Sequence, residues 1–243
     1  MSTLLLRLSG PLQSWGVRSK YTRRDTAREP TKSGVIGMLA AARGVERTDP
    51  IPDDLLSLRF GVRTDQPGTI MSDFQTARRL DGSSLPLSYR HYLADAKFLV
   101  ALEGDGDVLE DLKRQLLRPA FPLYLGRRSC PPGAPVIGTL DERGLADVLQ
   151  QHEWIVGDAY ARTQPKKVVL SISRDVLPEE LASGNIGRLG ATVRDVPISF
   201  APEHRRHGWR VVVPDRVEIT NPLGRNISGR QSAPPHEPAA FGD

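Results

Sequence analysis

Short apolar runs, separated by Gly, Pro and polar segments, predict strands that alternate with two helices. The first run, Thr3–Leu8, is too short for a typical helix and is followed by a Ser-Gly-Pro turn, which favours a buried strand. A helix is expected next, because apolar positions recur at helical spacing after Ser33, which can cap its first turn. Gly44 can end this helix in the left-handed conformation.

The middle of the chain repeats this pattern. Asp107 can cap a second helix that runs to about Leu117. The polar segment Ile70–Tyr92 lies between two strand-like runs and contains an Asp-Gly pair, which predicts a protruding hairpin. Three further strands are predicted at Leu58–Arg63, Ala96–Leu102 and Val136–Leu140.

The resulting order of strand, helix, strand, strand, helix, strand is that of a ferredoxin-like (RRM-like) α+β domain. We expect this domain over residues 1–145, with the hairpin at about 66–95. Two later strand-like runs, Val168–Ser173 and Trp209–Val213, predict a small C-terminal β extension over 146–220. Residues 221–243 are rich in Pro and Gly and predict a disordered tail.

Length and composition exclude several classes of protein. A chain of 243 residues can bury a core without disulfides, and a single cysteine excludes both an internal disulfide framework and a four-thiolate zinc site. The longest nearly uncharged stretch, 33–42, is far shorter than the roughly 20 residues that span a bilayer. The amino end lacks a signal-sequence pattern, so we expect a cytoplasmic protein without a membrane partner.

Positive charge is concentrated near the amino end. The chain carries a net charge of only +4, but residues 1–47 contain nine basic and three acidic side chains. Most of the basic residues are arginines, whose planar guanidinium groups bind phosphate with paired hydrogen bonds and stack on bases. The segment therefore favours a nucleic-acid ligand, and the alternative is an ordinary solvated basic loop.

No common enzyme motif is present. The sequence has no dinucleotide fingerprint, P-loop, zincin motif or nucleophile elbow, which lowers the support for most enzyme classes. His204 and His207 have the spacing of two helical metal ligands, but the two arginines between them would repel a cation. We therefore expect no catalytic residues, no metal and no cofactor.

His91 has the strongest local potential for chemistry. It lies in the segment Tyr89-Arg-His-Tyr92, beside a cation and two aromatic rings. RNA cleavage by attack of the 2′-hydroxyl needs a base, an acid and a positive group, and this segment holds candidates for those roles. The alternative, which we favour, is a patch that stacks bases and contacts phosphates.

Three other segments combine polar and aromatic groups in loops. The segment Tyr124–Pro132 contains Arg127-Arg128-Ser129 and favours polyanion recognition, although a structural turn with exposed arginines is the alternative. The segment Thr31–Gly34 can offer N–H groups and a lysine to a phosphate, although capping alone would explain its serine. Trp15 is either a base-stacking platform or a hydrophobic plug.

Several of these segments together resemble a known protein family. The sequence resembles the CasD family, the Cas5-type (RAMP) subunits of type I-E CRISPR Cascade complexes, from about residue 3 to residue 213. Four motifs in the same order carry the resemblance, and two later segments support it: Leu6–Gly16, Pro30–Gly37, Tyr89–Ala96 and Tyr124–Pro131, then Val196–Phe200 and Trp209–Val213.

The resemblance implies a function in antiviral DNA interference. It implies a ferredoxin-like fold with a thumb hairpin that grips the repeat-derived 5′ handle of the guide CRISPR RNA and caps one end of the complex. The implied protein partners are the backbone subunit CasC and the large subunit CasA, and target DNA is met only through the complex. Residues expected at the RNA, from the resemblance and the basic loop together, are Gln13, Trp15, Arg18, Lys20, Lys32, Ser33, Arg90, His91, Tyr92, Arg127, Arg128 and Ser129.

Two alternatives remain open at the level of sequence. A related subfamily in another CRISPR subtype cuts precursor RNA, so a metal-independent endoribonuclease that uses His91 is the main alternative. In the type I-E subtype the precursor is cut by a different subunit, CasE, which favours a noncatalytic holder. A stand-alone polyanion-binding protein would need only the basic surface and would show no dependence on RNA sequence.

Overall fold

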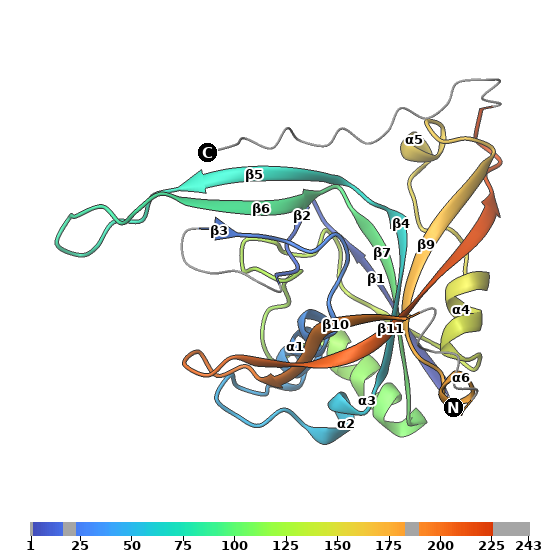
Figure 1. Ribbon diagram of the computed structural model, residues 1–243, viewed down its shortest axis with the longest axis horizontal. Helices are drawn as coiled ribbons and strands as arrows, with labels where there is room; N and C mark the ends of the chain where they lie inside the picture. The colour runs from blue at the N-terminus through green and yellow to red at the C-terminus, as the bar shows by residue number, and fades with distance from the viewer. Residues whose placement is uncertain (1, 17–22, 183–189, 226–243) are drawn as a thin grey trace.

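The chain folds around one large antiparallel β-sheet with helices on both of its faces (Figure 1). The computed structural model describes residues 2–16, 23–182 and 190–225. The seven strands of this sheet lie in the order β10-β11-β9-β4-β7-β1-β8. In chain order their bounds are β1 Ser2–Ser9, β4 Arg59–Gln66, β7 Lys97–Gly104, β8 Gly138–Asp141, β9 Lys167–Asp175, β10 Ala191–Ser199 and β11 Arg206–Thr220.

The continuous apolar run of β1 reflects burial on both faces of the sheet. Leu4 pairs with Leu102 of β7, and its side chain packs in the core beneath the helices α1 (Lys32–Arg43) and α3 (Gly106–Leu117). The neighbouring Leu5 faces the opposite side and packs against α4 (Leu145–Gln151). A strand that is covered on both sides needs no alternation of polar and apolar residues.

Both long helices begin two residues before the positions predicted from the sequence. The cap of α1 is Thr31 rather than Ser33, and its hydroxyl accepts a hydrogen bond from the Gly34 N–H at 3.2 Å. The cap of α3 is Asp105 rather than Asp107, because its carboxylate accepts from two backbone N–H groups of the first turn. The predicted end of α1 is confirmed, since Gly44 has a φ of 86°.

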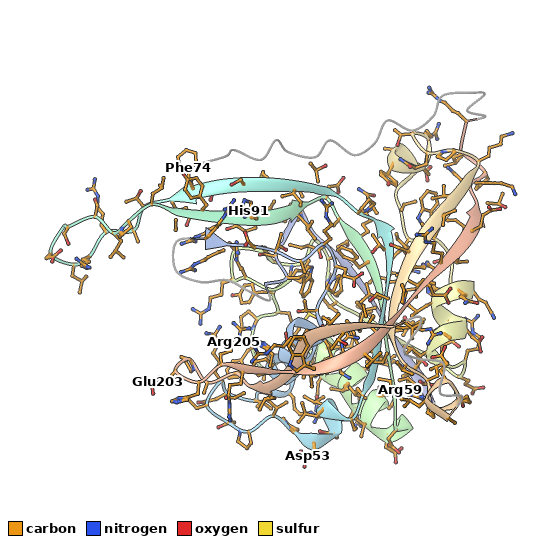
Figure 2. The ribbon with its side chains drawn as sticks, in the orientation of Figure 1. Asp53, Arg59, Phe74, His91, Glu203 and Arg205 are labelled. Carbon is orange, nitrogen blue, oxygen red and sulfur yellow. The ribbon has the colours of Figure 1, made fainter. Side chains whose placement is uncertain are left out.

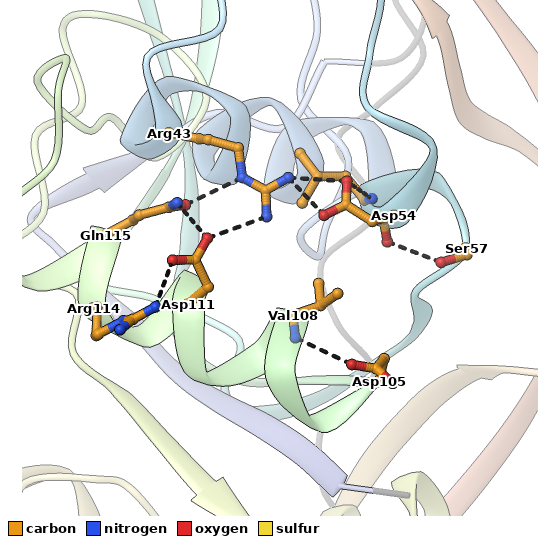
Figure 3. Close-up of polar contacts among 9 residues, drawn as sticks. Arg43, Asp54, Ser57, Asp105, Val108, Asp111, Arg114 and Gln115 are labelled. Atoms are coloured by element: carbon orange, nitrogen blue, oxygen red, sulfur yellow. Dashed lines mark hydrogen bonds and ion pairs between the residues drawn. The ribbon is translucent and has the colours of Figure 1, made fainter.

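Arg43 in the last turn of α1 connects three helices (Figure 3). Its guanidinium forms an ion pair with Asp54 of the short helix α2 (Asp53–Leu56) at 2.7 Å. It also donates a hydrogen bond to Gln115 of α3 at 3.2 Å and lies 3.8 Å from Asp111. These contacts fix the carboxyl end of α1 against the helices α2 and α3.

A second, smaller sheet extends away from the main one (Figure 1). Its long members are β5 (Thr69–Gln75) and β6 (Ser88–Ala94), which pair antiparallel from Thr69↔Ala94 to Gln75↔Ser88 and protrude as a hairpin. The short strands β2 (Leu12–Gln13) and β3 (Arg23–Arg24) also pair with β6. The amino-terminal loop is therefore attached to the base of this hairpin.

The carboxyl-terminal strands continue the main sheet. Strand β9 pairs antiparallel with β4, and the long strand β11 pairs with β9 through one half and with β10 through the other. Figure 1 shows the β10–β11 hairpin curving across the side of the molecule that holds α1. We call this the C-terminal hairpin.

The segment between β8 and β9 contains α4 and a single helical turn, α5 (Asp158–Ala161). It is held to the sheet by Arg63, which is fully buried and forms an ion pair with Asp65 at 2.7 Å. Arg63 also donates to the carbonyls of Leu149, His152 and Glu153. Another short helix, α6 (Pro178–Ala182), follows β9.

The chain end expected to be disordered begins with packed residues. Asn221 is 1% exposed and donates hydrogen bonds to the Ala161 and Pro165 carbonyls. The predicted boundary at 221 is therefore too early, and the remainder of that segment, 226–243, lies outside the described residues. No helix in the described parts of the chain combines the length and the apolar character needed to cross a bilayer.

Candidate nucleic-acid interface

A large groove lies between the base of the β5–β6 hairpin and the C-terminal hairpin. Its volume is about 1430 Å³, which exceeds the 300–1,000 Å³ typical of pockets for small molecules. Small residues of α1, among them Gly34, Gly37 and Ala41, lie along it, and the segment 121–129 contributes its other loop residues. A groove of this size and openness suits a polymer better than a metabolite.

Six arginines and one carboxylate, that of Glu46, line the groove among the described residues. The arginines come from five separate segments of the chain, and none of them forms an ion pair with a carboxylate within the described residues. They are Arg24, Arg47, Arg90, Arg127, Arg128 and Arg205. Elsewhere arginines are commonly paired with carboxylates, and these paired arginines include Arg7, Arg43, Arg59, Arg63, Arg143, Arg174 and Arg210.

Two of the groove arginines are neighbours on adjacent strands. Arg24 of β3 is the register partner of Arg90 of β6 in a parallel pairing. Like charges placed opposite each other across a sheet destabilise the pairing. The Nε of Arg90 is also buried without a hydrogen-bond partner among the described residues. The two positions therefore favour an anion in the groove.

Arg127 has a structural role as well as a place in the groove. Its guanidinium donates to the backbone carbonyls of His91 at 3.1 Å and of Arg24 at 2.7 Å. It also lies over the ring of Tyr92, 5.0 Å from the centroid. These contacts join the segment 121–129 to β3 and β6, so Arg127 holds the base of the hairpin together.

Arg128 and Ser129 follow on the exposed side of the same turn. The turn depends on Gly126, whose φ is 94° and whose position against the Ser14 carbonyl leaves no room for a side chain. Next to them, Cys130 is fully buried, and desolvation raises the pKa of its thiol. Cys130 is thus a packed thiol, while Arg128 and Ser129 are exposed at the groove.

Gln13 and Trp15 are almost fully buried, which does not fit their predicted role as RNA contacts, although Trp15 is among the residues that line the groove. Trp15 is 1% exposed under α1, and its indole donates a hydrogen bond to Gln13 at 3.0 Å. Gln13 in turn donates to the Ala96 carbonyl at 2.8 Å and is fully buried. Of the two roles considered for Trp15, the structure supports the hydrophobic plug.

Lys32 and Ser33 are likewise buried, and the lysine is occupied by an ion cluster. The ammonium of Lys32 lies 2.9 Å from Asp175 of β9, and its backbone N–H donates to Asp195 of β10. Arg210 of β11 joins both carboxylates at 2.6 Å. These four residues form what we call the ion cluster, which joins α1 to the C-terminal strands, and Lys32 has no free charge for a phosphate. Ser33 lines the groove but is 4% exposed.

His91 and Tyr92 lie beside the groove and do not line it. The Nδ1 of His91 is 2.9 Å from the Asp25 carboxylate, and the Tyr92 ring is 3% exposed beneath Arg127. Arg90 does line the groove. The remaining two predicted residues, Arg18 and Lys20, lie outside the described residues.

Sequence reasoning missed the second wall of the groove. This wall contains Arg47, which follows α1, and residues of the C-terminal hairpin: Phe200, Pro202, Arg205 and His207. His204 and His207 drew attention as possible metal ligands, but the described residues contain no metal-binding group of His, Cys, Asp and Glu. The pair of arginines between these histidines was used in the sequence analysis only as an argument against a metal, although it also indicated a surface for an anion.

Comparison with known proteins identifies the family. The model of the family described as CRISPR-associated protein Cas5 matches residues 3–213. The chain belongs to the Cas5 family. Its resemblance to Cas5-type proteins, inferred from four sequence motifs, is thereby confirmed.

Relatives of this Cas5 chain cover nearly all of its length. It is 35% identical, over 87% of the chain and 96% of the relative, to the CRISPR system Cascade subunit CasD of Escherichia coli K12. A solved structure of a CRISPR RNA-guided surveillance complex contains a chain that is 31% identical, with a TM-score of 0.68 and coverage of 91% and 92% of the two chains. A crystal structure of a Cas protein is 36% identical, with a TM-score of 0.68 and coverage of 92% and 98%.

Proposed function

We propose that this Cas5 protein is the subunit of a Cascade-type surveillance complex that holds the 5′ handle of the guide CRISPR RNA in its arginine-lined groove. The observation that carries the proposal is the set of six groove arginines without carboxylate partners among the described residues. Unpaired guanidinium groups in a polymer-sized groove fit a sugar-phosphate chain, since phosphate contacts supply most of the affinity for nucleic acids. The relatives named above include a Cascade subunit and a chain of an RNA-guided complex.

The scaffold under the groove supports this assignment. The order β4-β7-β1-β8, with α1 and α3 as the two crossovers, corresponds to a ferredoxin-like arrangement. We infer that the β5–β6 hairpin is the thumb of this domain. The thumb and the C-terminal hairpin then form the two sides of the RNA groove.

The thumb carries exposed apolar side chains that suit a protein partner. Phe74 is 70% exposed on β5, and Figure 2 shows it on the protruding part of the thumb. Tyr89 on β6 is 47% exposed, and Leu80 at the tip is fully exposed. Exposed apolar patches of this kind mark interaction surfaces. We propose that the thumb meets the terminal copy of the backbone subunit CasC and that the large subunit CasA binds elsewhere on the chain.

Substitution of Arg127 and Arg128 by alanine tests the RNA assignment. We expect the double variant to weaken binding of the handle RNA and assembly of the complex by more than about 1 kcal/mol, because charge-assisted hydrogen bonds contribute that much or more. Binding of the purified chain to a single-stranded RNA of the handle sequence measures the effect. Unchanged RNA retention and assembly would contradict the proposal.

Two controls separate binding from folding. Arg127 also supports the thumb base, so Arg128→Ala alone tests a side chain that is exposed and has no structural partner among the described residues. A matched variant with Arg162→Ala and Arg216→Ala removes two exposed arginines outside the groove and should leave RNA binding unchanged. Melting temperatures of all variants show whether each one is folded.

We infer that the chain holds the RNA without cutting it. His91, the best candidate base, is engaged with Asp25 and does not line the groove. We therefore expect His91→Ala to leave processing of precursor RNA intact when the nuclease subunit CasE is supplied. Cleavage of the precursor by the purified chain, lost after this single substitution, would favour the endoribonuclease alternative.

A further inference from the structure

The second wall of the groove, at the C-terminal hairpin, contains another pair of arginines. Arg47 follows the end of α1, and Arg205 lies in the turn of the C-terminal hairpin, directly before β11. Both side chains line the groove. Figure 2 shows Arg205 near the outer end of this hairpin, on the side nearer the thumb.

Arg47 lies close enough to Arg205 for its positive charge to act on the Arg205 guanidinium. The pKa of Arg205 is lowered, first by desolvation and then by the positive charge of Arg47. Neither arginine has an ion pair with a carboxylate in the described part of the chain. Two neighbouring cations without a counterion are stabilised by an anion that binds between them.

His207 adds a third unsatisfied group beside this pair. Its Nε2 is buried and has no hydrogen-bond partner among the described residues. Desolvation, Arg205 and Arg194 lower the pKa of His207, and Asp195 opposes them. The same surroundings that disfavour a positive charge on His207 leave its Nε2 without a partner among the described residues.

The chemistry around the pair favours a nucleotide over an acidic peptide. Guanidinium groups bind the oxygens of a phosphate in pairs, and aromatic rings support bases by stacking. Phe200 lines the same part of the groove and packs against Gly37, where an added Cβ would lie 3.3 Å from the ring. A phosphate at the arginines would thus place its attached nucleoside near an aromatic residue.

We propose that Arg47 and Arg205 form a second phosphate-binding subsite, which holds a phosphodiester of the same RNA strand that the arginines of the opposite wall contact. This inference rests on the proposed function, because it requires RNA in the groove. It adds the C-terminal hairpin to the RNA-binding surface. The strand then runs across α1 and is held at both sides.

The test measures how RNA affinity depends on salt. The purified full-length chain and a double variant, Arg47→Ala with Arg205→Ala, are titrated with single-stranded handle RNA at several salt concentrations. We expect affinity to fall about tenfold or more, because charge-assisted contacts to one phosphate are lost. The slope of log affinity against log salt should become shallower by about 0.7 for each phosphate contact removed.

Matched variants control for position, for charge and for folding. Arg216→Ala, an exposed arginine outside the groove, should change neither affinity nor slope. The double variant Arg47→Lys with Arg205→Lys should keep the slope but bind RNA more weakly than the wild type, because lysine lacks the planar fork. Melting temperatures confirm that every variant is folded.

The outcomes separate this subsite from the function itself. If Arg128→Ala weakens RNA binding but the Arg47 and Arg205 variants match the wild type, the subsite is wrong and the proposed function stands. If no groove variant affects RNA binding, the proposed function fails. If the Arg47 and Arg205 variants bind RNA normally but do not join the protein complex, these arginines serve a protein partner and the subsite is overturned.

Discussion

Trp15 shows how a residue with an RNA-binding character can serve the interior instead. Its ring lies so close to α1 that a Cβ added at Gly34 would be 2.8 Å from it. Its backbone N–H donates to Thr26, and its carbonyl accepts from Ala27. The packed ring and these backbone hydrogen bonds together fix the amino-terminal loop against α1, at the groove.

We expect Trp15→Ala to lower the free energy of unfolding by about 3–5 kcal/mol, which is typical when a large buried aromatic residue is removed. Urea denaturation of the purified chain measures this change. Trp15→Phe keeps most of the packing and should cost less. A variant of wild-type stability that had lost RNA affinity would show that the ring is a stacking platform after all.

At the scale of single residues, the sequence indicates exposure and surroundings best where the context is local. Arg128 lies in a turn whose glycine and proline neighbours are visible in the sequence, and the structure places it at the groove. Lys32 was misassigned because its partner, Asp175, is 143 positions away in the chain. The identity of a lysine does not reveal whether a distant carboxylate neutralises it.

At the scale of elements, the ion cluster determines how the C-terminal hairpin sits on α1. Asp195 is 1% exposed and accepts hydrogen bonds from the Lys32 backbone N–H and from the Arg210 guanidinium. Because β10 and β11 carry one wall of the groove, this cluster also positions Arg205. Loss of one carboxylate would leave the buried Arg210 without part of its compensation.

We expect Asp195→Ala to destabilise the protein by about 3–5 kcal/mol, since it breaks a buried ion pair from one side. Thermal or urea unfolding provides the measurement. Glu218→Ala is the matched control, because its ion pair with Lys167 is exposed and should contribute about 0–1 kcal/mol. Equal effects of the two substitutions would show that the ion cluster does not hold the hairpin.

The short helix α6 is attached to β9 by a second ion pair, which makes stability depend on pH. Hydrogen bonds from Arg174 lower the pKa of Glu180 to about 2, from an ordinary value of 4.5. A carboxyl group whose pKa is lower in the folded state stabilises the fold fully above its unfolded pKa. This contribution is lost as the pH falls from about 4.5 towards 2.

We expect Glu180→Gln to remove this part of the acid sensitivity. The free energy of unfolding, measured at several pH values in the wild type and the variant, should differ at neutral pH and converge as the pH approaches 2. Other carboxyl groups, such as Asp141, change both proteins equally. A difference that stays constant with pH would contradict the assigned role of the ion pair.

The elements themselves were predictable to different degrees. The first strand and the two long helices were located within two residues, because apolar runs, caps and the Gly44 stop are local signals. Helix α4 was missed, since seven residues give too short a period to recognise. The pairing of β9 with β4 joins residues far apart in the chain, so the sequence indicated strands there without showing that they extend the main sheet.

At the scale of the whole molecule, two surfaces of different character lie at the hairpins. The groove between them carries the positive charge, while the exposed apolar residues on the thumb include Phe74, Leu80 and Tyr89. The apolar surface lies within one hairpin of the sequence, but the groove draws on segments far apart in the chain, which explains why Arg47, Phe200 and Arg205 could not be grouped before the fold was known.

We expect Phe74→Ser to weaken assembly with protein partners by about 1–2 kcal/mol, because burial of an exposed aromatic ring is lost, and to leave RNA affinity of the isolated chain unchanged. Co-purification with the other subunits measures assembly. Val169→Ser, at a residue on β9 that is 58% exposed, is the matched control and should have little effect. Loss of RNA affinity by the Phe74 variant would place the RNA on the thumb surface instead.

The neighbouring arginines of β3 and β6 have a consequence for how much of this subunit persists in the cell. Arg24 and Arg90 repel each other in the unloaded protein, so the strands that carry them are most stable once a polyanion is present. Chains that are made in excess over the guide RNA would remain without a bound polyanion. They would then unfold at a lower temperature and be more readily cleaved by proteases. The amount of this subunit would then follow the amount of guide RNA without a dedicated regulator.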